Sequence, residues 1–215
     1  MAITFPRDFP LGGLFTNPAP FALVYQQSQA ITGGGAVNAA DLGPAYWSCE
    51  FRTKCLRAED FEEWQAWGAS LRGGLRLFKG RPPGRRWPLA HRKGFAGMLY
   101  SAAQWSGLGN LSVIGASRDT ITVNQIANGL VLKPGDWLSI PVGTRQHLHK
   151  ITVGATSAGN AITVDIEPPI RPGVVTGIAV RFDTPFCDMV LKDGAFMAAR
   201  EGRGGSISFT GLQVL

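Results

Sequence analysis

Residues 130–172 constrain the fold most, because they read as short apolar stretches separated by turn residues. The stretches lie at 130–140, 147–153 and 162–172, with Pro-Gly at 134–135 and Ser-Ala-Gly-Asn at 157–160. Residues of these types reverse the chain between strands. The segment therefore predicts a compact β module, and it contains no residue pattern that is typical of a catalyst.

The composition also favours β structure over a helix bundle. The 215 residues include 28 glycines and 14 prolines, a larger share than the roughly 12% of an ordinary chain. No apolar run approaches the roughly 20 residues of a membrane span, and the first residues lack the pattern of a secretory signal. Three cysteines without a CxxC pair are expected to be reduced thiols of a protein made in a cytoplasm, although a Cys49–Cys55 disulfide is an alternative.

Residues 1–105 are expected to begin with an arm and to continue with strands and one helix. The arm, residues 1–20, has little regular structure of its own and is expected to dock on its own domain or on a neighbour through the apolar anchors Phe5, Phe9 and Phe15. Strands are predicted at 21–28, 46–54 and 75–78, with a flexible turn at 32–35. A helix is predicted at 58–71, because aromatic residues recur there at helical spacing and acidic residues fill its first turns.

After residue 105 the chain becomes rich in β-branched residues, and candidate strands recur about every ten residues. They are predicted at 111–115, 120–125, 136–140, 146–153, 161–166 and 177–182. This spacing suggests a small barrel or sandwich. Residues 188–194 and 206–215 are expected to rejoin the first sheet. The predicted organisation is therefore one domain of residues 1–105 and 184–215, with a small β-barrel of residues 106–183 inserted into it.

Positive charge is concentrated in residues 79–93, which hold six Lys and Arg and no acid in a chain of net charge +6. Three prolines exclude a regular helix there, so a basic, partly extended loop is predicted. Nucleic-acid binding is one interpretation, but the barrel segment has few aromatic residues for base stacking. Pairing with acidic groups of a neighbouring subunit is favoured. The proposed electrostatic contact residues are Arg81, Arg85, Arg86, Arg92 and Lys93.

Catalytic and metal sites find little support in the sequence. There is neither a GxSxG nor a GxxxxGK(S/T) motif. His147 and His149 share one strand face, as in some metal sites, with Asp136 and Asp165 as the nearest candidate third ligands. A structural histidine pair is the favoured interpretation. We expect no enzyme activity, no cofactor and no metal.

Three segments together resemble a known family. They read AEDFEEWQAW at 58–67 with LRGGLRLF at 71–78, LKPGDWLSI at 132–140 with HLHKIT at 147–152, and VDIEPPIR at 164–171. Across residues 45–215 the chain resembles the distal tail proteins of bacteriophages with long, non-contractile tails.

The resemblance implies a structural virion protein. Its ring-forming domain would be a tail-tube-like β-sandwich, and the inserted barrel would be OB-like, although in many relatives the accessory domain follows the ring domain. Such proteins form a hexameric ring that joins the tail tube protein to the hub or baseplate protein. DNA passes through the lumen without sequence-specific binding, and assembly takes place in the bacterial host cytoplasm. Alternatives are another tail component (tube, terminator or tip accessory) or a carbohydrate- or nucleic-acid-binding module.

Overall fold

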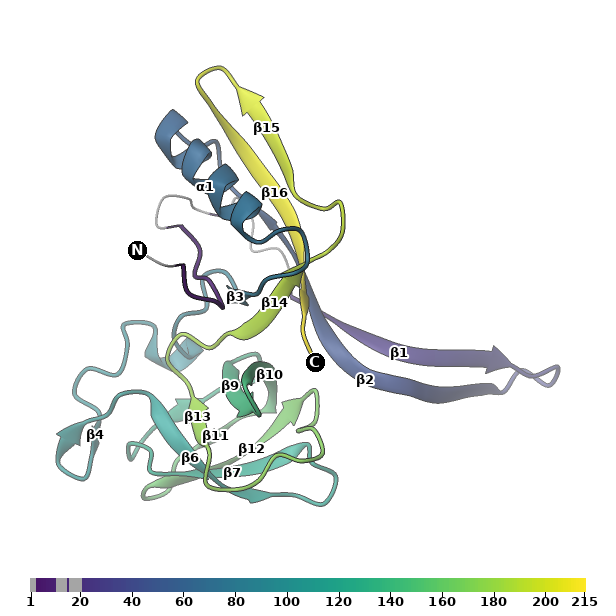
Figure 1. Cartoon of the computed structure of the whole chain (residues 1–215). Coiled ribbons are helices and arrows are strands. Elements are labelled where there is room, and N and C mark those ends of the chain that lie inside the picture. The colour runs from purple at the N-terminus through teal and green to yellow at the C-terminus, as the bar shows by residue number, and fades with distance from the viewer. Residues whose placement is uncertain (1–2, 11–14, 16–20) are drawn as a thin grey trace.

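A computed structural model describes residues 3–10, 15 and 21–215, and within them the chain is mainly β with one α-helix, as the sequence predicts. An open sheet with the helix lies in the upper part of Figure 1, and a closed barrel lies below it. Two small sheets pair β4 (Leu99–Tyr100) with β5 (Ala103–Gln104) and β8 (Val131–Leu132) with β11 (Ala155–Thr156). Within this part of the chain, no helix is long and apolar enough to cross a membrane.

The open sheet has the strand order β1-β2-β16-β14-β3, and β15 pairs with β16. Its members are β1 (Ala22–Ile31), β2 (Val37–Arg52), β3 (Phe78–Gly80), β14 (Cys187–Leu191), β15 (Met197–Glu201) and β16 (Gly204–Gln213). Trp47, Cys49 and Phe51 point from β2 into the core, as predicted, where Ile207 and Phe209 of β16 join them. Strands from both ends of the chain therefore share one sheet.

The helix α1 (Ala58–Ser70) covers this apolar face with the fully buried side chains of Phe61, Trp64 and Trp67. The helix was predicted within one residue. The predicted strand 75–78 is wrong, because the chain makes turns after Leu71 and strand β3 begins only at Phe78. The amide of Arg76 donates to the carbonyl of Leu71, so the alternating residues of this stretch close the helix end.

The opposite face of the sheet is polar and only partly covered. It presents the half-buried or exposed side chains of Ser48, Glu50, Arg52, Ser206, Ser208 and Thr210. A β-sandwich would bury this face against a second sheet. Among the described residues the sheet is instead covered on one face only, by the helix and the arm.

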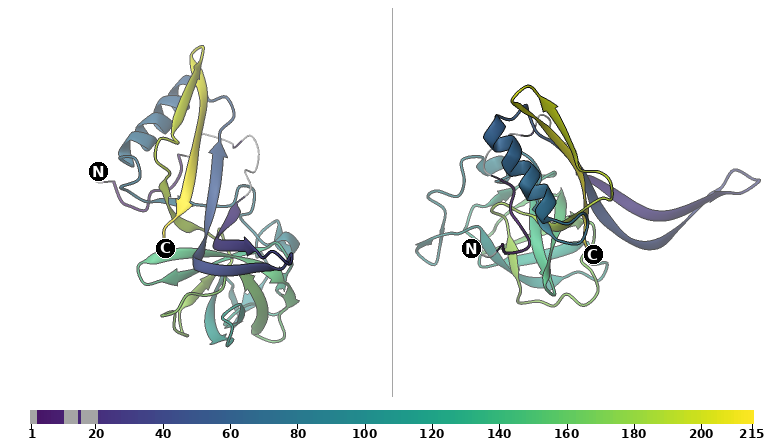
Figure 2. Two further views of the ribbon diagram at one scale, coloured as in Figure 1. Left: turned by 90° about the vertical axis from the view of Figure 1, so that its right-hand side faces the viewer. Right: turned by 45° about the horizontal axis from the view of Figure 1, so that its top comes forward.

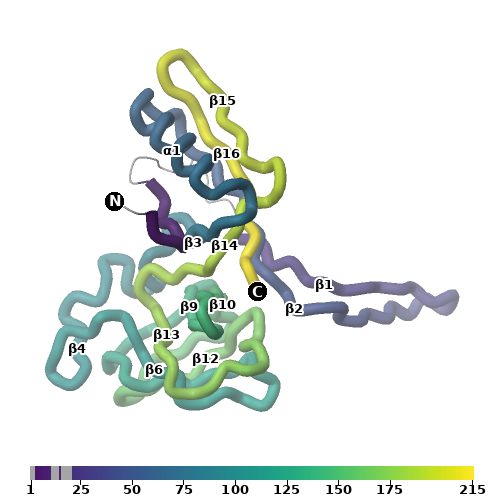
Figure 3. Tube along the Cα trace, viewed as in Figure 1, coloured from purple at the N-terminus to yellow at the C-terminus, as the bar shows by residue number. Residues whose placement is uncertain are grey.

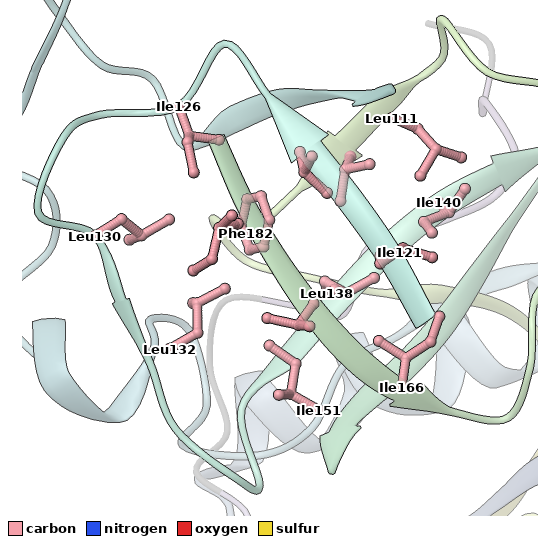
Figure 4. Close-up of a cluster of buried hydrophobic side chains, with 14 of the residues drawn as sticks. Leu111, Ile121, Ile126, Leu130, Leu132, Leu138, Ile140, Ile151, Ile166 and Phe182 are labelled. Carbon is pink, nitrogen blue, oxygen red and sulfur yellow. The ribbon is translucent and has the colours of Figure 1, made fainter. Parts of the chain in front are cut away.

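The barrel closes in the order β10-β12-β7-β6-β13-β9. Its strands are β6 (Leu108–Ile114), β7 (Thr120–Asn124), β9 (Trp137–Val142), β10 (Arg145–Val153), β12 (Ala161–Glu167) and β13 (Ala179–Arg181). Each overlaps a strand that the sequence predicts, and the alternating aliphatic side chains fill the interior (Figure 4). The OB-fold has five strands, so a barrel of six departs from that expectation in strand number.

The barrel and the sheet are joined through a shared apolar contact. The indole Nε1 of Trp47 donates to the carbonyl of Leu148 at 2.7 Å, and its ring meets that of Trp137 at a centroid distance of 4.8 Å. The chain leaves the sheet after β3 and returns in β14, and these two strands pair with each other. Between β3 and the barrel, a 3-10 turn η1 (Leu89–His91) is followed by Phe95 and Trp105, which pack into the barrel core although they precede residue 106.

Candidate assembly surfaces

The outer part of β1 and β2 forms a long hairpin that projects from the molecule (Figures 1 and 2). Every residue from Tyr25 to Pro44 is exposed except Gly43, which is half-buried. The tip is closed across the Gly-Gly-Gly turn at 33–35, where the amide of Thr32 donates to the carbonyl of Ala36 and the amide of Ala36 donates to Oγ1 of Thr32. The hairpin therefore extends beyond both cores of the molecule.

The hairpin surface is short of charge and carries isolated apolar side chains. Asp41 is its one charged residue, and it accepts a hydrogen bond from Gln27 Nε2 at 2.8 Å. Ile31, Val37 and Leu42 are 77%, 61% and 72% exposed. A two-stranded hairpin is marginally stable by itself in water, and the outer edge of β1 presents unpaired backbone groups. Both faces and one edge are thus open to a partner.

The sequence predicts the first part of β1 and the turn of this hairpin, but it predicts neither the outer part of β2, residues 37–45, nor the projection. The sequence signal for the projection is a change of composition after Val24. From there, Gln, Ser, Ala and Asn replace the alternating large side chains that a buried face requires.

The predicted arm anchors lie against the chain's own sheet and helix. Phe9 packs among Trp67 and Phe78 with ring centroids 5.6 and 5.7 Å away, and Phe15 meets Phe51 at 5.4 Å. The ring of Phe5 lies under the guanidinium of Arg76, at 4.7 Å. The intramolecular docking fits one of the two predicted alternatives, and exchange between subunits stays a prediction. Residues 11–14 and 16–20 of the arm lie outside the described residues.

The basic segment contributes to a pocket of about 640 Å³ between the arm, the segment after β3 and the segment after β13. It brings together Arg81, Arg85 and Arg86 of the predicted contact residues, whereas Arg92 and Lys93 do not line it. The remaining lining residues are Phe9, Phe15, Lys79, Pro82, Pro83, Gly84, Arg181, Thr184, Pro185 and Phe186. Arg181 comes from β13, far along the chain, and its neighbours in the sequence give no signal that it lines this pocket.

Acidic groups of the same chain neutralise part of this pocket. Asp8 accepts from Lys79 Nζ at 2.8 Å and from Arg81 at 2.5 Å, and Asp183 lies 4.0 Å from Arg86. Such partly exposed pairs contribute little to stability. The five lining cations exceed these two acids, so the pocket remains basic and suits an anionic partner.

Asp136, one of the candidate third metal ligands, has other partners. The carboxylate of the buried Asp136 accepts from the amides of Leu89 and Lys133, each at 2.7 Å, and therefore holds two loops together. Burial raises the pKa of the Cys49 thiol to about 12, which makes it a poor nucleophile. Cys49, Cys55 and Cys187 form no disulfide bond within the described part of the chain. Within the described part of the chain, no three His, Cys, Asp or Glu side chains come together as a metal site would require.

No protein-family model matches the chain, and no curated protein matches it at a significant level.

Proposed function

We propose that this protein is a structural subunit of a phage tail, which forms a hexameric ring at the distal end of the tail between the tube and the hub or baseplate. The observation that supports an assembling protein best is the projecting hairpin, which is exposed beyond the bond from Tyr25 to Glu167 at its root. The resemblance of the three sequence segments supports the tail in particular.

Burying the hairpin on a neighbour would explain its length and its composition. At about 3.3 Å per residue, ten residues of β1 reach well past the sheet that anchors them. A contact between the hairpin of one subunit and a different surface of the next is heterologous, and such contacts generate a ring when the rotation closes. Low charge on the hairpin agrees with the depletion of charge at interface centres.

The ring would also complete the finer architecture that the resemblance implies. Strands of a neighbour would add to the open sheet and give the tail-tube-like sandwich. DNA would pass through the lumen of the ring without sequence-specific contacts. The barrel would be an OB-like decoration of the ring, and assembly would occur in the host cytoplasm before the virion is complete.

The test is a variant in which an Asn-Gly turn replaces residues 26–44, so that the two strands are joined beside the sheet. We expect rings of the native chain in light scattering and negative-stain images, and a monomeric variant with an unchanged melting temperature, because the deleted residues bury no core. The matched point variants are Ile31→Ser with Leu42→Ser on the hairpin and Leu75→Ser with Val175→Ser elsewhere, all four being exposed. Only the first pair should weaken assembly.

Rings of unchanged stability without the hairpin would refute its role. A native chain that stays monomeric even beside its tube and hub partners would refute the ring itself.

The basic pocket favours a second candidate, a nucleic-acid-binding module. Under that alternative, Arg85→Ala with Arg86→Ala should weaken binding and reduce the salt slope of log K by about 2. Under the proposed tail function we expect only weak binding to DNA. The double variant Lys133→Ala with Lys192→Ala, which removes two exposed lysines outside the pocket, should then weaken DNA binding as much as the double arginine variant does. Fluorescence anisotropy with a DNA duplex at several salt concentrations distinguishes the two cases.

A further inference from the structure

A second pocket, of about 270 Å³, lies where the root of the hairpin meets the barrel and the last strand. We call it the histidine pocket. Its wall combines β2, β10, β16 and the loops before β7 and after β12. The lining residues are Pro44, Ala45, Ser117, Arg118, His147, His149, Pro168, Pro169, Ile170, Arg171, Pro172 and Gln213. The pocket therefore lies at the junction of the sheet and the barrel, separate from the basic pocket described above.

The ionisable groups of the histidine pocket are two arginines and two histidines, its neutral polar groups are those of Ser117 and Gln213, and no carboxylate lines it. His147 and His149 are 3% and 2% exposed. Three buried nitrogen atoms of its wall have no hydrogen-bond partner: Nε2 of His147, Nε2 of His149 and Nη2 of Arg171. Buried polar atoms in proteins are nearly always paired, so three unpaired nitrogens on the residues of one pocket point to a ligand that they share. Nη2 of Arg171 is a donor, and a histidine Nε2 becomes one when its ring is protonated.

The two arginines have different tasks. Arg118 donates from Nε to the carbonyl of Ile170 at 2.7 Å and from Nη2 to the carbonyl of Arg171. These bonds fix the loop that carries Arg171 against the pocket. Arg171 is consequently held in place by its backbone, while its guanidinium keeps a nitrogen for a ligand.

The histidines are poised to gain protons when an anion arrives. Nδ1 of His149 lies 2.6 Å from the carbonyl of Pro168, and because a carbonyl can only accept, Nδ1 carries the hydrogen of the neutral ring and Nε2 is bare. Burial, and then the charge of Arg171, lower the pKa of His147 to about 4, and burial is also the main cause that lowers the pKa of His149 to about 4. A bound anion would oppose both causes.

Carboxylates on the strands beside β10 do not line the pocket. Asp188 of β14 accepts from the amide of Gln146 at 3.1 Å through Oδ2, and its buried Oδ1 has no hydrogen-bond partner. On β12, Asp165 accepts from Thr120 at 2.6 Å and Glu167 accepts from Tyr25 at 3.2 Å. The charges that face the histidines from the lining of the pocket are therefore those of Arg118 and Arg171.

We propose that the histidine pocket binds a free small oxyanion of the size of sulfate or phosphate, and that binding is coupled to proton uptake by His147 and His149. Salt screens the attraction little, because the two histidines are almost fully buried. Affinity rises as the pH falls from neutrality towards 4. The proposal does not depend on the tail function.

The test is calorimetric titration of the full chain with sulfate at pH 7.5 and pH 5.0, at constant ionic strength set with chloride. Sulfate keeps its charge between pH 5.0 and pH 7.5, so a change in affinity reports protonation of the protein. If the anion returns one histidine to its ordinary pKa of about 6.5, affinity at pH 5.0 should exceed that at pH 7.5 roughly 30-fold. Sulfate in the basic pocket would show no such dependence, because only Lys and Arg supply its cations.

Arg171→Gln should weaken sulfate binding at pH 5.0 at least about tenfold, whereas Lys192→Gln, which removes one exposed charge elsewhere, should leave it unchanged. Proton NMR of the native chain gives a measurement that needs no variant, since sulfate should raise the pKa of both histidines. Any one of three results would overturn the proposal: equal affinity for sulfate at the two pH values, unchanged affinity in Arg171→Gln, or histidine pKa values that sulfate does not shift.

Discussion

Replacing Trp67 with alanine is expected to lower the free energy of unfolding by about 3–5 kcal/mol, the usual cost of deleting a buried aromatic side chain. Trp67 is fully buried. Its ring meets those of Trp64, Phe78 and Phe209 at 5.3–5.5 Å, and its Nε1 donates to the carbonyl of Asp8 at 2.9 Å. The indole thus joins the helix, the sheet and the arm. Chemical denaturation measures the loss.

Trp67→Phe is the matched control. Phenylalanine keeps an aromatic ring in the core but removes the donor to Asp8, so we expect a loss closer to the roughly 1 kcal/mol of a single hydrogen bond. It should also release the arm, which faster cleavage by a protease in residues 3–10 would show. An alanine variant that loses less than about 1 kcal/mol would mean that the helix does not depend on this contact.

Acid is expected to destabilise the protein between pH 6.5 and about 4 when no anion is bound. The folded-state pKa of His147 and of His149 is lowered to about 4, while the unfolded value is about 6.5. The unfolded chain therefore binds more protons in this window, and stability falls as the pH falls. Each histidine contributes roughly 3 kcal/mol at most, at 1.36 kcal/mol per pKa unit. Urea denaturation in chloride buffers at pH 7, 5 and 4 gives the profile.

His147→Gln with His149→Gln should flatten this profile, because the amide side chains do not titrate. Asp188 acts in the opposite direction, since burial raises its pKa and its protonation relieves a cost as the pH falls. That contribution begins above the ordinary carboxyl pKa, so it offsets part of the histidine loss at the acidic end of the window. Unchanged stability of the native chain from pH 7 to pH 4 would show that the pair is not buried in the neutral form.

Much of the fold follows from local patterns in the sequence. Aromatic residues at helical spacing after an acidic first turn predict α1 within one residue. Alternating β-branched residues between turn signals predict the barrel strands. In both cases one face of the element is buried, so its period appears in the sequence.

The surfaces were harder to predict because distant residues form them. β15 was missed, since its five residues are all exposed and their side chains carry no alternation. The basic pocket needs Arg181 from β13, and the histidine pocket needs Arg171 from the loop after β12. His147 and His149 were recognised as a pair on one face, but the lack of a carboxylate around them follows only from the tertiary structure.

The pairing of β3 with β14 has an evolutionary consequence. Gly80 lies opposite Cys187 in this pair, and the trace in Figure 3 shows the intervening chain leaving and rejoining the sheet at one place. The chain between Gly80 and Cys187 could therefore be gained, lost or exchanged during evolution in a single insertion or deletion. A short hairpin turn would then connect β3 directly to β14. Trp47, whose ring and Nε1 contact the barrel, is the residue that would then have to change.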